Sequence, residues 1–316
     1  MSQKIIAVAG ATGAQGGGLV RAILSDPQKT YRVRALTRDA NSPKAQELAK
    51  LGAEVVSANV DDLDSLKHAF DGCYGAFCVT FYWDHFSPQR ETQQATNLAQ
   101  AASAAGVQHA IWSTLEDTRQ FYPLSDTTRM PTLMGSYKVP HLDSKGEADH
   151  VFADLGLPTT FLLTSFYWDN FIYFGMGPKR SPDGKLVLSL PMANAKLAGI
   201  AAVDIGRCSF GIFQRGKEFQ GRRVGIVGEW LTGNEMAARF TEALGQPVTY
   251  QAIPFDVYRN LGFPGADDLG NMFQFFAEQG DAMASTRRVE LSRSLNPQLQ
   301  DLRTWLAQNK SNIPLQ

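Results

Sequence analysis

The chain has 316 residues, of which 44% are hydrophobic and 19% are charged. This length suits one large domain with a smaller appended lobe, and the composition is ordinary for a globular protein. The formal net charge of −1 provides no long-range field that would hold nucleic acid or an anionic membrane. The charge balance therefore argues against direct nucleic-acid binding.

The cysteines and the apolar segments indicate the compartment. Cys73, Cys78 and Cys208 are an odd set without C-x-x-C spacing, which predicts buried thiols, no disulfide framework and no zinc site. His85 has no second ligand at metal spacing, so no metal site is predicted. The apolar run at residues 5–9 is predicted to be a strand and not a signal peptide, and no segment approaches the ~20 apolar residues of a membrane span. We expect a cytoplasmic protein.

The first half of the chain alternates strand and helix patterns. Strands are predicted at residues 5–9, 31–37, 54–58, 75–80, 109–113 and 159–164. Helices are predicted at residues 14–25, 43–51, 62–70, 89–105 and 141–155. Six strands that alternate with helices predict a Rossmann-type α/β fold, with a doubly wound and mostly parallel sheet.

The pattern changes after about residue 165. Strands are predicted at residues 186–190, 222–227 and 248–252, and helices at 203–214, 234–244, 255–261, 267–279 and 298–308. We therefore predict a nucleotide-binding domain over residues 1–165 and a smaller α/β lobe over residues 166–316. The lobe is expected to cover the crevice at the carboxyl ends of the strands, where such sheets place their ligands.

A glycine-rich loop connects the first predicted strand to the first helix. Its glycines stand at Gly10, Gly13 and Gly16, three residues apart. Gly10 permits a tight turn, Gly13 lets the backbone approach a diphosphate, and Gly16 allows close packing of the helix on the sheet. The helix N-terminus then directs free N–H groups at the phosphates. Because the loop lies between a strand and a helix, the motif predicts dinucleotide binding.

Arg38 follows the second predicted strand, where proteins that bind NAD usually place a carboxylate for the ribose 2′-hydroxyl. An arginine at this place accommodates a 2′-phosphate, which favours NADP(H) over NAD(H). Asp39 comes next and would either repel that phosphate or point into solvent.

Five stretches of the sequence together resemble the NmrA-like family of atypical short-chain dehydrogenase/reductases. These are Gly-Ala-Thr-Gly-Ala-Gln-Gly-Gly (residues 10–17), Val-Thr-Phe-Tyr-Trp (79–83), His-Leu-Asp-Ser-Lys-Gly-Glu (141–147), Asp-Gly-Lys (183–185) ahead of Leu-Ser-Leu-Pro (188–191), and Leu-Gly-Phe-Pro-Gly-Ala (261–266) ahead of Asn-Met-Phe (271–273). The likeness covers nearly the whole chain. It is similar to the part of the family that includes a cytosolic NADPH sensor.

The resemblance implies a set of cofactor contacts. They are Gly10, Ala11, Thr12, Gly13, Ala14, Gln15 and Gly16 at the phosphates, Arg38 at the 2′-phosphate, Asn59 and Val60 at the adenine, Thr80, Phe81, Tyr82 and Lys145 at the far ribose, and Tyr167, Trp168, Asp169 and Asn170 at the nicotinamide. The sequence departs from the family at residues 39–42, which lack further basic residues, and in an insertion at residues 117–139.

Reductases of this superfamily usually hold a Tyr-x-x-x-Lys pair, whose members share one helix face. This chain has His141 four residues before Lys145. A histidine can supply a proton at neutral pH, so His141 and Lys145 are candidate catalytic residues, although a helix-start role for His141 is the simpler interpretation. Ser113 and Thr114, at the end of the fifth strand, either contact a substrate carbonyl or only satisfy the backbone. Glu116 and Asp117 have no evident partner in the sequence.

Two functions fit these features. The first is a regulator that binds NADP(H) and passes the redox state to a partner protein, through loop order or homodimer formation. The second is an NADPH-dependent reductase of a quinone or another small carbonyl compound, which would stack on the aromatic residues of 81–86 and 166–174. The same aromatic residues would also serve to seal the two lobes together.

Overall fold

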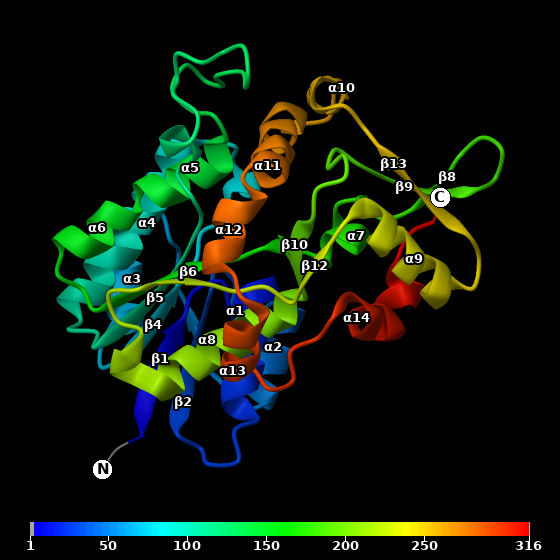
Figure 1. Ribbon diagram of the computed structural model, residues 1–316. Helices are drawn as coiled ribbons and strands as arrows, with labels where there is room; N and C mark the ends of the chain where they lie inside the picture. The colour runs from blue at the N-terminus through cyan, green and yellow to red at the C-terminus, as the bar shows by residue number, and fades with distance from the viewer. Residues whose placement is uncertain (1–2, 316) are drawn as a thin grey trace.

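The computed structural model describes residues 3–315, and its centre is a seven-stranded parallel sheet (Figure 1). The strand order is β11-β6-β5-β4-β1-β2-β3. The strands are β1 (Lys4–Val8), β2 (Tyr31–Thr37), β3 (Glu54–Ser57), β4 (Gly75–Cys78), β5 (His109–Thr114), β6 (Thr159–Leu163) and β11 (Arg223–Gly225). This arrangement confirms the predicted Rossmann-type fold, with one correction. The sheet has a seventh strand, because β11 returns from the second half of the chain to pair with β6.

Helices cover both faces of the sheet, as its buried strands require. One face carries α1 (Ala14–Leu24), α2 (Pro43–Lys50), α8 (Ala202–Arg215) and α13 (Val289–Leu295). The other carries α3 (Leu63–Phe70), α4 (Pro88–Ala104), α5 (Pro140–Glu147) and α6 (Asp149–Asp154). The helix predicted over residues 141–155 is therefore two helices. Between them the backbone forms a tighter turn, in which the Val151 N–H donates to the carbonyl of Ala148, three residues earlier.

Helices α1 and α8 pack with their backbones in direct contact. A Cβ atom on Gly18 would lie 2.8 Å from the Val203 carbonyl oxygen, and one on Gly206 would overlap the backbone of Leu19. Only glycine permits this approach. The helix that follows the glycine-rich loop is thus fixed by a helix from the second half of the chain.

The smaller lobe contains two three-stranded sheets. One is β12 (Glu229–Leu231), β10 (Leu197–Ile200) and β7 (Phe166–Tyr167), and the other is β13 (Val248–Ala252), β9 (Leu186–Leu190) and β8 (Lys179–Arg180). Its helices are α7 (Asn170–Tyr173), α9 (Gly233–Leu244), α10 (Phe255–Arg259), α11 (Ala266–Glu278), α12 (Gly280–Thr286) and α14 (Leu302–Asn309). Short 3-10 turns occur in both halves of the chain, at η1 (Tyr82–Asp84) and η2 (Thr118–Gln120) in the first and at η3 (Gly216–Glu218) and η4 (Lys310–Asn312) in the second. The lobe has its own buried core, which includes Phe166, Trp168 and Phe171.

The insertion at residues 117–139 folds against α11. The Asn271 side chain donates to the carbonyls of Pro131 (3.0 Å) and Lys138 (2.5 Å), and Gln274 donates to that of Arg129 (2.8 Å). The Lys138 ammonium is buried and donates to two carbonyls of the insertion itself. The insertion therefore joins the first half of the chain to the smaller lobe.

The three cysteines are buried and unpaired, as predicted. Burial raises the pKa of the Cys73 thiol to about 11 and that of Cys78 to about 12, so both stay protonated. Among the helices of residues 3–315, none is both long and apolar enough to span a bilayer.

Candidate functional site

The strand order reverses between β1 and β4, and parallel sheets bind ligands at the carboxyl ends of the strands on either side of such a point. The loops after β1 and β4 meet there. A Cβ atom on Gly10 would lie 3.1 Å from the Val79 side chain. The glycine-rich loop and the segment that begins at Thr80 therefore lie side by side at this point, where folds of this kind place the ligand crevice.

The glycine-rich loop fits a diphosphate. Gly10 has a φ of +62°, and the Gly13 N–H donates to its carbonyl at 2.9 Å. A side chain on Gly16 would overlap that same carbonyl oxygen. The N–H groups of Thr12, Ala14, Gln15 and Gly16 donate to no acceptor in residues 3–315, and the Gly13 cap of α1 has no side-chain bond. These free donors at a helix N-terminus are the groups that hold phosphate oxygens.

Arg38 lies at the tip of β2 with its side chain 72% exposed, where it forms an ion pair with Asp84 of η1 (2.9 Å). The neighbouring Asp39 carboxylate accepts from the Asn41 N–H at 2.8 Å, so it caps its own turn. Asn59 is exposed and Val60 half-buried beyond the end of β3. The Arg38 guanidinium is thus accessible to a phosphate, but a carboxylate already neutralises it.

Lys145, on α5, points at the segment after β4. Its ammonium donates to the Thr80 carbonyl (3.2 Å) and hydroxyl (2.7 Å), and lies 2.7 Å from the Glu91 carboxylate of α4. Glu91 is completely buried. Burial alone would raise its pKa, but Lys145, His85 and Thr80 together hold that pKa at about 2. Lys145 is therefore held by a permanent negative charge.

His141 lies in the first turn of α5, and its ring is fixed by the smaller lobe. Its Nδ1 lies 2.6 Å from a carboxylate oxygen of Asp268 on α11, and its backbone N–H donates to the other oxygen (3.2 Å). The indole of Trp83 packs on the ring, with 4.7 Å between the centroids. Asp268 thus accepts from the backbone in the first turn of α5 and orients the imidazole. Nε2 takes part in no hydrogen bond within residues 3–315.

Ser113 and Tyr167 meet across the crevice through Gln15. The Ser113 hydroxyl donates to the Gln15 side-chain oxygen at 2.8 Å, and the Gln15 amide donates to the Tyr167 hydroxyl at 2.5 Å. Thr164, after β6, has its hydroxyl 3.5 Å from that of Tyr167. Two hydroxyls from different strands therefore face one amide group.

The structure does not bring every candidate residue to this crevice. Trp168 is buried in the smaller lobe, where its indole lies against Gly199 and leaves no room for a Cβ. Asp169 accepts from the Ala202 N–H at 2.9 Å, at the start of α8. Phe81 is 55% exposed, whereas Tyr82 is buried and its hydroxyl has no partner in residues 3–315.

Glu116 has a partner that the sequence did not reveal. The Arg287 guanidinium, fully buried beside β11, forms a two-point ion pair with it at 2.5 and 2.9 Å. Burial would raise the pKa of Glu116, but Arg287 lowers it. Arg287 also donates to the Thr164 carbonyl (3.0 Å). The pair is a structural tie between the halves of the chain and not an acid/base couple.

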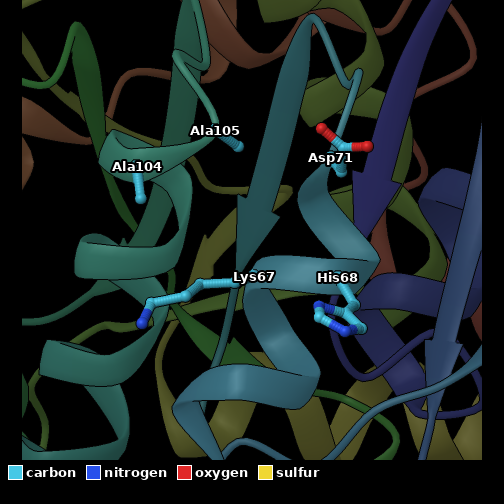
Figure 2. Close-up of a pocket in the computed structure, with 5 residues that line it drawn as sticks. All are labelled: Lys67, His68, Asp71, Ala104 and Ala105. Atoms are coloured by element: carbon cyan, nitrogen blue, oxygen red, sulfur yellow. The ribbon is translucent and has the colours of Figure 1, made fainter.

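A surface hollow lies far from this crevice. Lys67, His68 and Asp71 of α3 and its end, with Ala104 and Ala105 at the end of α4, surround a space of about 600 Å³ (Figure 2). These helix ends precede β4 and β5, so the hollow lies at the amino edge of the sheet. Within the described residues, no group of three or more His, Cys, Asp or Glu side chains is placed to hold a metal ion.

Comparison with known proteins identifies the family. The model of the NmrA-like family matches residues 2–306. The chain belongs to the NmrA-like family. One relative is an NmrA-like family domain-containing oxidoreductase of Aspergillus hancockii, 28% identical over 287 residues, which are 85% of this chain and 82% of that protein.

Solved structures of other proteins share the fold. The negative transcriptional regulator Nmra in complex with NADP is 24% identical, with a TM-score of 0.77 over 97% of this chain and 95% of that one, and the same regulator has a structure with NAD. The triphenylmethane reductase of Citrobacter sp., complexed with NADP(H), is 20% identical, with a TM-score of 0.72 over 97% of this chain and 99% of that one.

Proposed function

We propose that this protein binds NADP(H) in the crevice between the loops after β1 and β4, and acts as a regulator that reports the redox state to a partner protein. The free N–H groups of the glycine-rich loop would hold the diphosphate. Thr80 and Lys145 would contact the far ribose, and Tyr167 lies on the side of the crevice assigned to the nicotinamide. When bound, the cofactor supplies a hydride or accepts one.

The observation that most favours regulation concerns His141. It stands where related reductases place their tyrosine, and its imidazole is tied to Asp268 and covered by Trp83. Only 7% of the residue is exposed, so little of it is accessible to a substrate. The sequence resemblance to the vertebrate NADPH sensor HSCARG and the likeness to a transcriptional regulator support the same proposal.

A preference for NADP(H) over NAD(H) is part of the proposal. It rests on Arg38, whose exposed guanidinium lies beyond the tip of β2, where a 2′-phosphate is read in this kind of fold. Because Asp84 competes for the same guanidinium, we expect the preference to be modest.

A second candidate function, an NADPH-dependent reductase of a quinone or another small carbonyl compound, is favoured by one specific observation. Ser113 and Tyr167 both hydrogen-bond the amide of Gln15. A substrate carbonyl that displaced this amide would meet two hydroxyls, and Lys145 is retained nearby. The oxidoreductase names of relatives agree with this candidate.

One experiment separates the two functions. The protein is titrated with NADPH and NADP⁺, and then incubated with NADPH and a panel of quinones and aldehydes while nicotinamide absorbance is followed. Saturable binding without turnover, accompanied by a change in molecular size or protease sensitivity, is the result expected of a regulator. Turnover that falls sharply in His141→Ala, Lys145→Ala or Tyr167→Phe would establish the reductase instead. A folded protein that binds neither coenzyme would refute both functions.

A further inference from the structure

Glu91 collects three polar contacts on one carboxylate that no solvent reaches. Its Oε1 accepts from the Thr80 hydroxyl and pairs with the Lys145 ammonium, both at 2.7 Å. Its Oε2 faces Nε2 of His85 at 3.3 Å. Oε2 of Glu91 and Nε2 of His85 are both buried, and neither has a hydrogen-bond partner in residues 3–315. Removing Glu91 would leave three polar groups without their common acceptor.

The orientation of His85 follows from its other nitrogen. The Ser87 N–H donates to Nδ1 at 3.0 Å, so Nδ1 is an acceptor and the proton of the neutral ring is on Nε2. That nitrogen lies 3.3 Å from Oε2 of Glu91, as a close polar contact and not as a hydrogen bond. The His85 side chain is 4% exposed and therefore part of the buried cluster.

The segment Thr80–Phe86 begins with Thr80 and has His85 next to its end. We call it the aromatic turn because it contains Phe81, Tyr82, Trp83 and Phe86. Glu91 holds the turn from inside through Thr80 and His85. Arg38 holds it from outside through Asp84. Trp83 also packs on His141, and both Trp83 and Phe86 face the Gly265 backbone ahead of α11. The turn thus extends from the crevice to the smaller lobe.

We infer that Glu91 is a positioning residue, which couples occupancy of the cofactor site at Lys145 to the order of the aromatic turn. This inference rests on the proposed binding of NADP(H). A ligand that draws on the Lys145 ammonium changes the contacts of Glu91, and Glu91 passes that change to Thr80 and His85. The surface that responds is the one formed by Trp83 and Phe86, toward the smaller lobe.

The physical basis is that the Thr80 hydroxyl has no acceptor other than Glu91 within residues 3–315, and that Lys145 has only Thr80 besides Glu91. In a buried site, a polar group that loses its partner has no water to replace it. Lys145, Thr80 and His85 are therefore obliged to adjust together. An exposed carboxylate at position 91 would let each group exchange its partner independently.

The test is hydrogen–deuterium exchange of the full chain with and without NADP⁺, followed in peptides from the glycine-rich loop (residues 10–16) and from the aromatic turn (residues 80–86). In the native protein, NADP⁺ is expected to slow exchange in both. In Glu91→Gln, which keeps the side-chain shape, we expect protection of the loop to persist and protection of the turn to be lost. The dissociation constant is expected to change by only about three- to tenfold, as for one side chain that must be ordered on binding.

Two further variants make the test specific. Lys145→Met is expected to remove turn protection as well, and the double variant is expected to be no worse than the single ones, because Glu91 acts through Lys145. Gln94→Ala is the control: it removes a partly buried contact of α4 to Asp61 (2.9 Å) that does not involve Lys145, and turn protection should be native in it.

The outcomes are distinguishable. Native protection of the turn in Glu91→Gln, or effects of Glu91→Gln and Lys145→Met on binding that add, would overturn the inference while leaving cofactor binding intact. Absence of protection in the glycine-rich loop of the native protein would refute the proposed function, and the coupling with it.

Discussion

Arg38 and Asp84 form an ion pair, 2.9 Å from nitrogen to oxygen, that connects the tip of β2 to the turn after β4. The two side chains are 72% and 47% exposed, so solvent screens the pair and its own stability is small. The pair matters for cofactor binding, because a 2′-phosphate that binds the Arg38 guanidinium must replace Asp84.

This pair predicts cofactor selectivity. Arg38→Ala is expected to weaken NADPH binding by up to about tenfold and to leave NADH nearly unchanged, since a charge-assisted contact to phosphate is lost. Asp84→Asn should strengthen NADPH binding severalfold. Titration calorimetry with both coenzymes checks this, with Arg32→Ala on the same strand as the charge-matched control. Equal losses for NADPH and NADH in Arg38→Ala would show that Arg38 does not read the phosphate.

The contact between α1 and α8 predicts a stability effect. Gly206→Ala places a methyl group into the backbone of Leu19, and helix backbones cannot yield as a flexible side chain does. We expect a loss of about 2–3 kcal/mol in the free energy of unfolding, measured by urea denaturation. Gly280→Ala is the matched helical control, since nothing lies within 4 Å of its added Cβ; it should change stability by no more than about 1 kcal/mol. Equal stability of the two variants would contradict this packing.

His109 predicts acid sensitivity. It is buried in β5 against Phe213, and burial lowers its pKa from the usual value of 6.5 to about 4. Below pH 6.5 the unfolded chain binds a proton that the folded chain does not. The stability that the neutral, buried His109 provides is therefore complete above that pH. As the pH falls toward 4, the free energy of unfolding decreases by up to about 1.4 kcal/mol per pH unit. The free energy of unfolding of His109→Gln should change less with pH between pH 4 and 7 than that of the native protein. An unchanged slope would mean that other groups dominate.

For the buried ion pair of Glu116 and Arg287, we expect replacement of one member to destabilise the protein more than replacement of both. Arg287 has no exposed side-chain surface, so Glu116→Gln leaves a buried positive charge and is expected to cost about 3–5 kcal/mol. The double variant Glu116→Gln/Arg287→Met should recover part of that loss, because no unpaired charge then remains. Thermal unfolding measures both, with the exposed Glu290→Gln as a control expected to be near native. A single variant no less stable than the double one would mean that the pair does not act as a unit.

The first half of the fold follows from periodicity alone. Continuous apolar strands such as β1 and β4 predict a sheet covered on both faces, and the glycine spacing after β1 locates the crevice. Strand β11 was predicted as a strand, but its place in the sheet was not. Three residues have no pattern that distinguishes a small sheet from the edge of a large one, and that choice depends on packing against β6.

The site residues that the sequence missed share a physical reason. Glu91 lies in a helix rich in Gln and Ala, where a glutamate is normally solvated, and its burial depends on Lys145, which is 54 positions later. Asp268 likewise belongs to an acidic helix start and meets His141 only through the tertiary fold. Arg38 and the glycines were accessible to prediction because their roles depend on local position after a strand.

The return of the chain to the central sheet has a mechanical consequence. The backbone leaves the half that contains the central sheet after β6, comes back for α8 and β11, leaves again for β12, and returns once more as α13. Several covalent crossings therefore join the two halves, unlike a pair of domains on a single tether. A single proteolytic nick at any one of these crossings should therefore leave the halves associated.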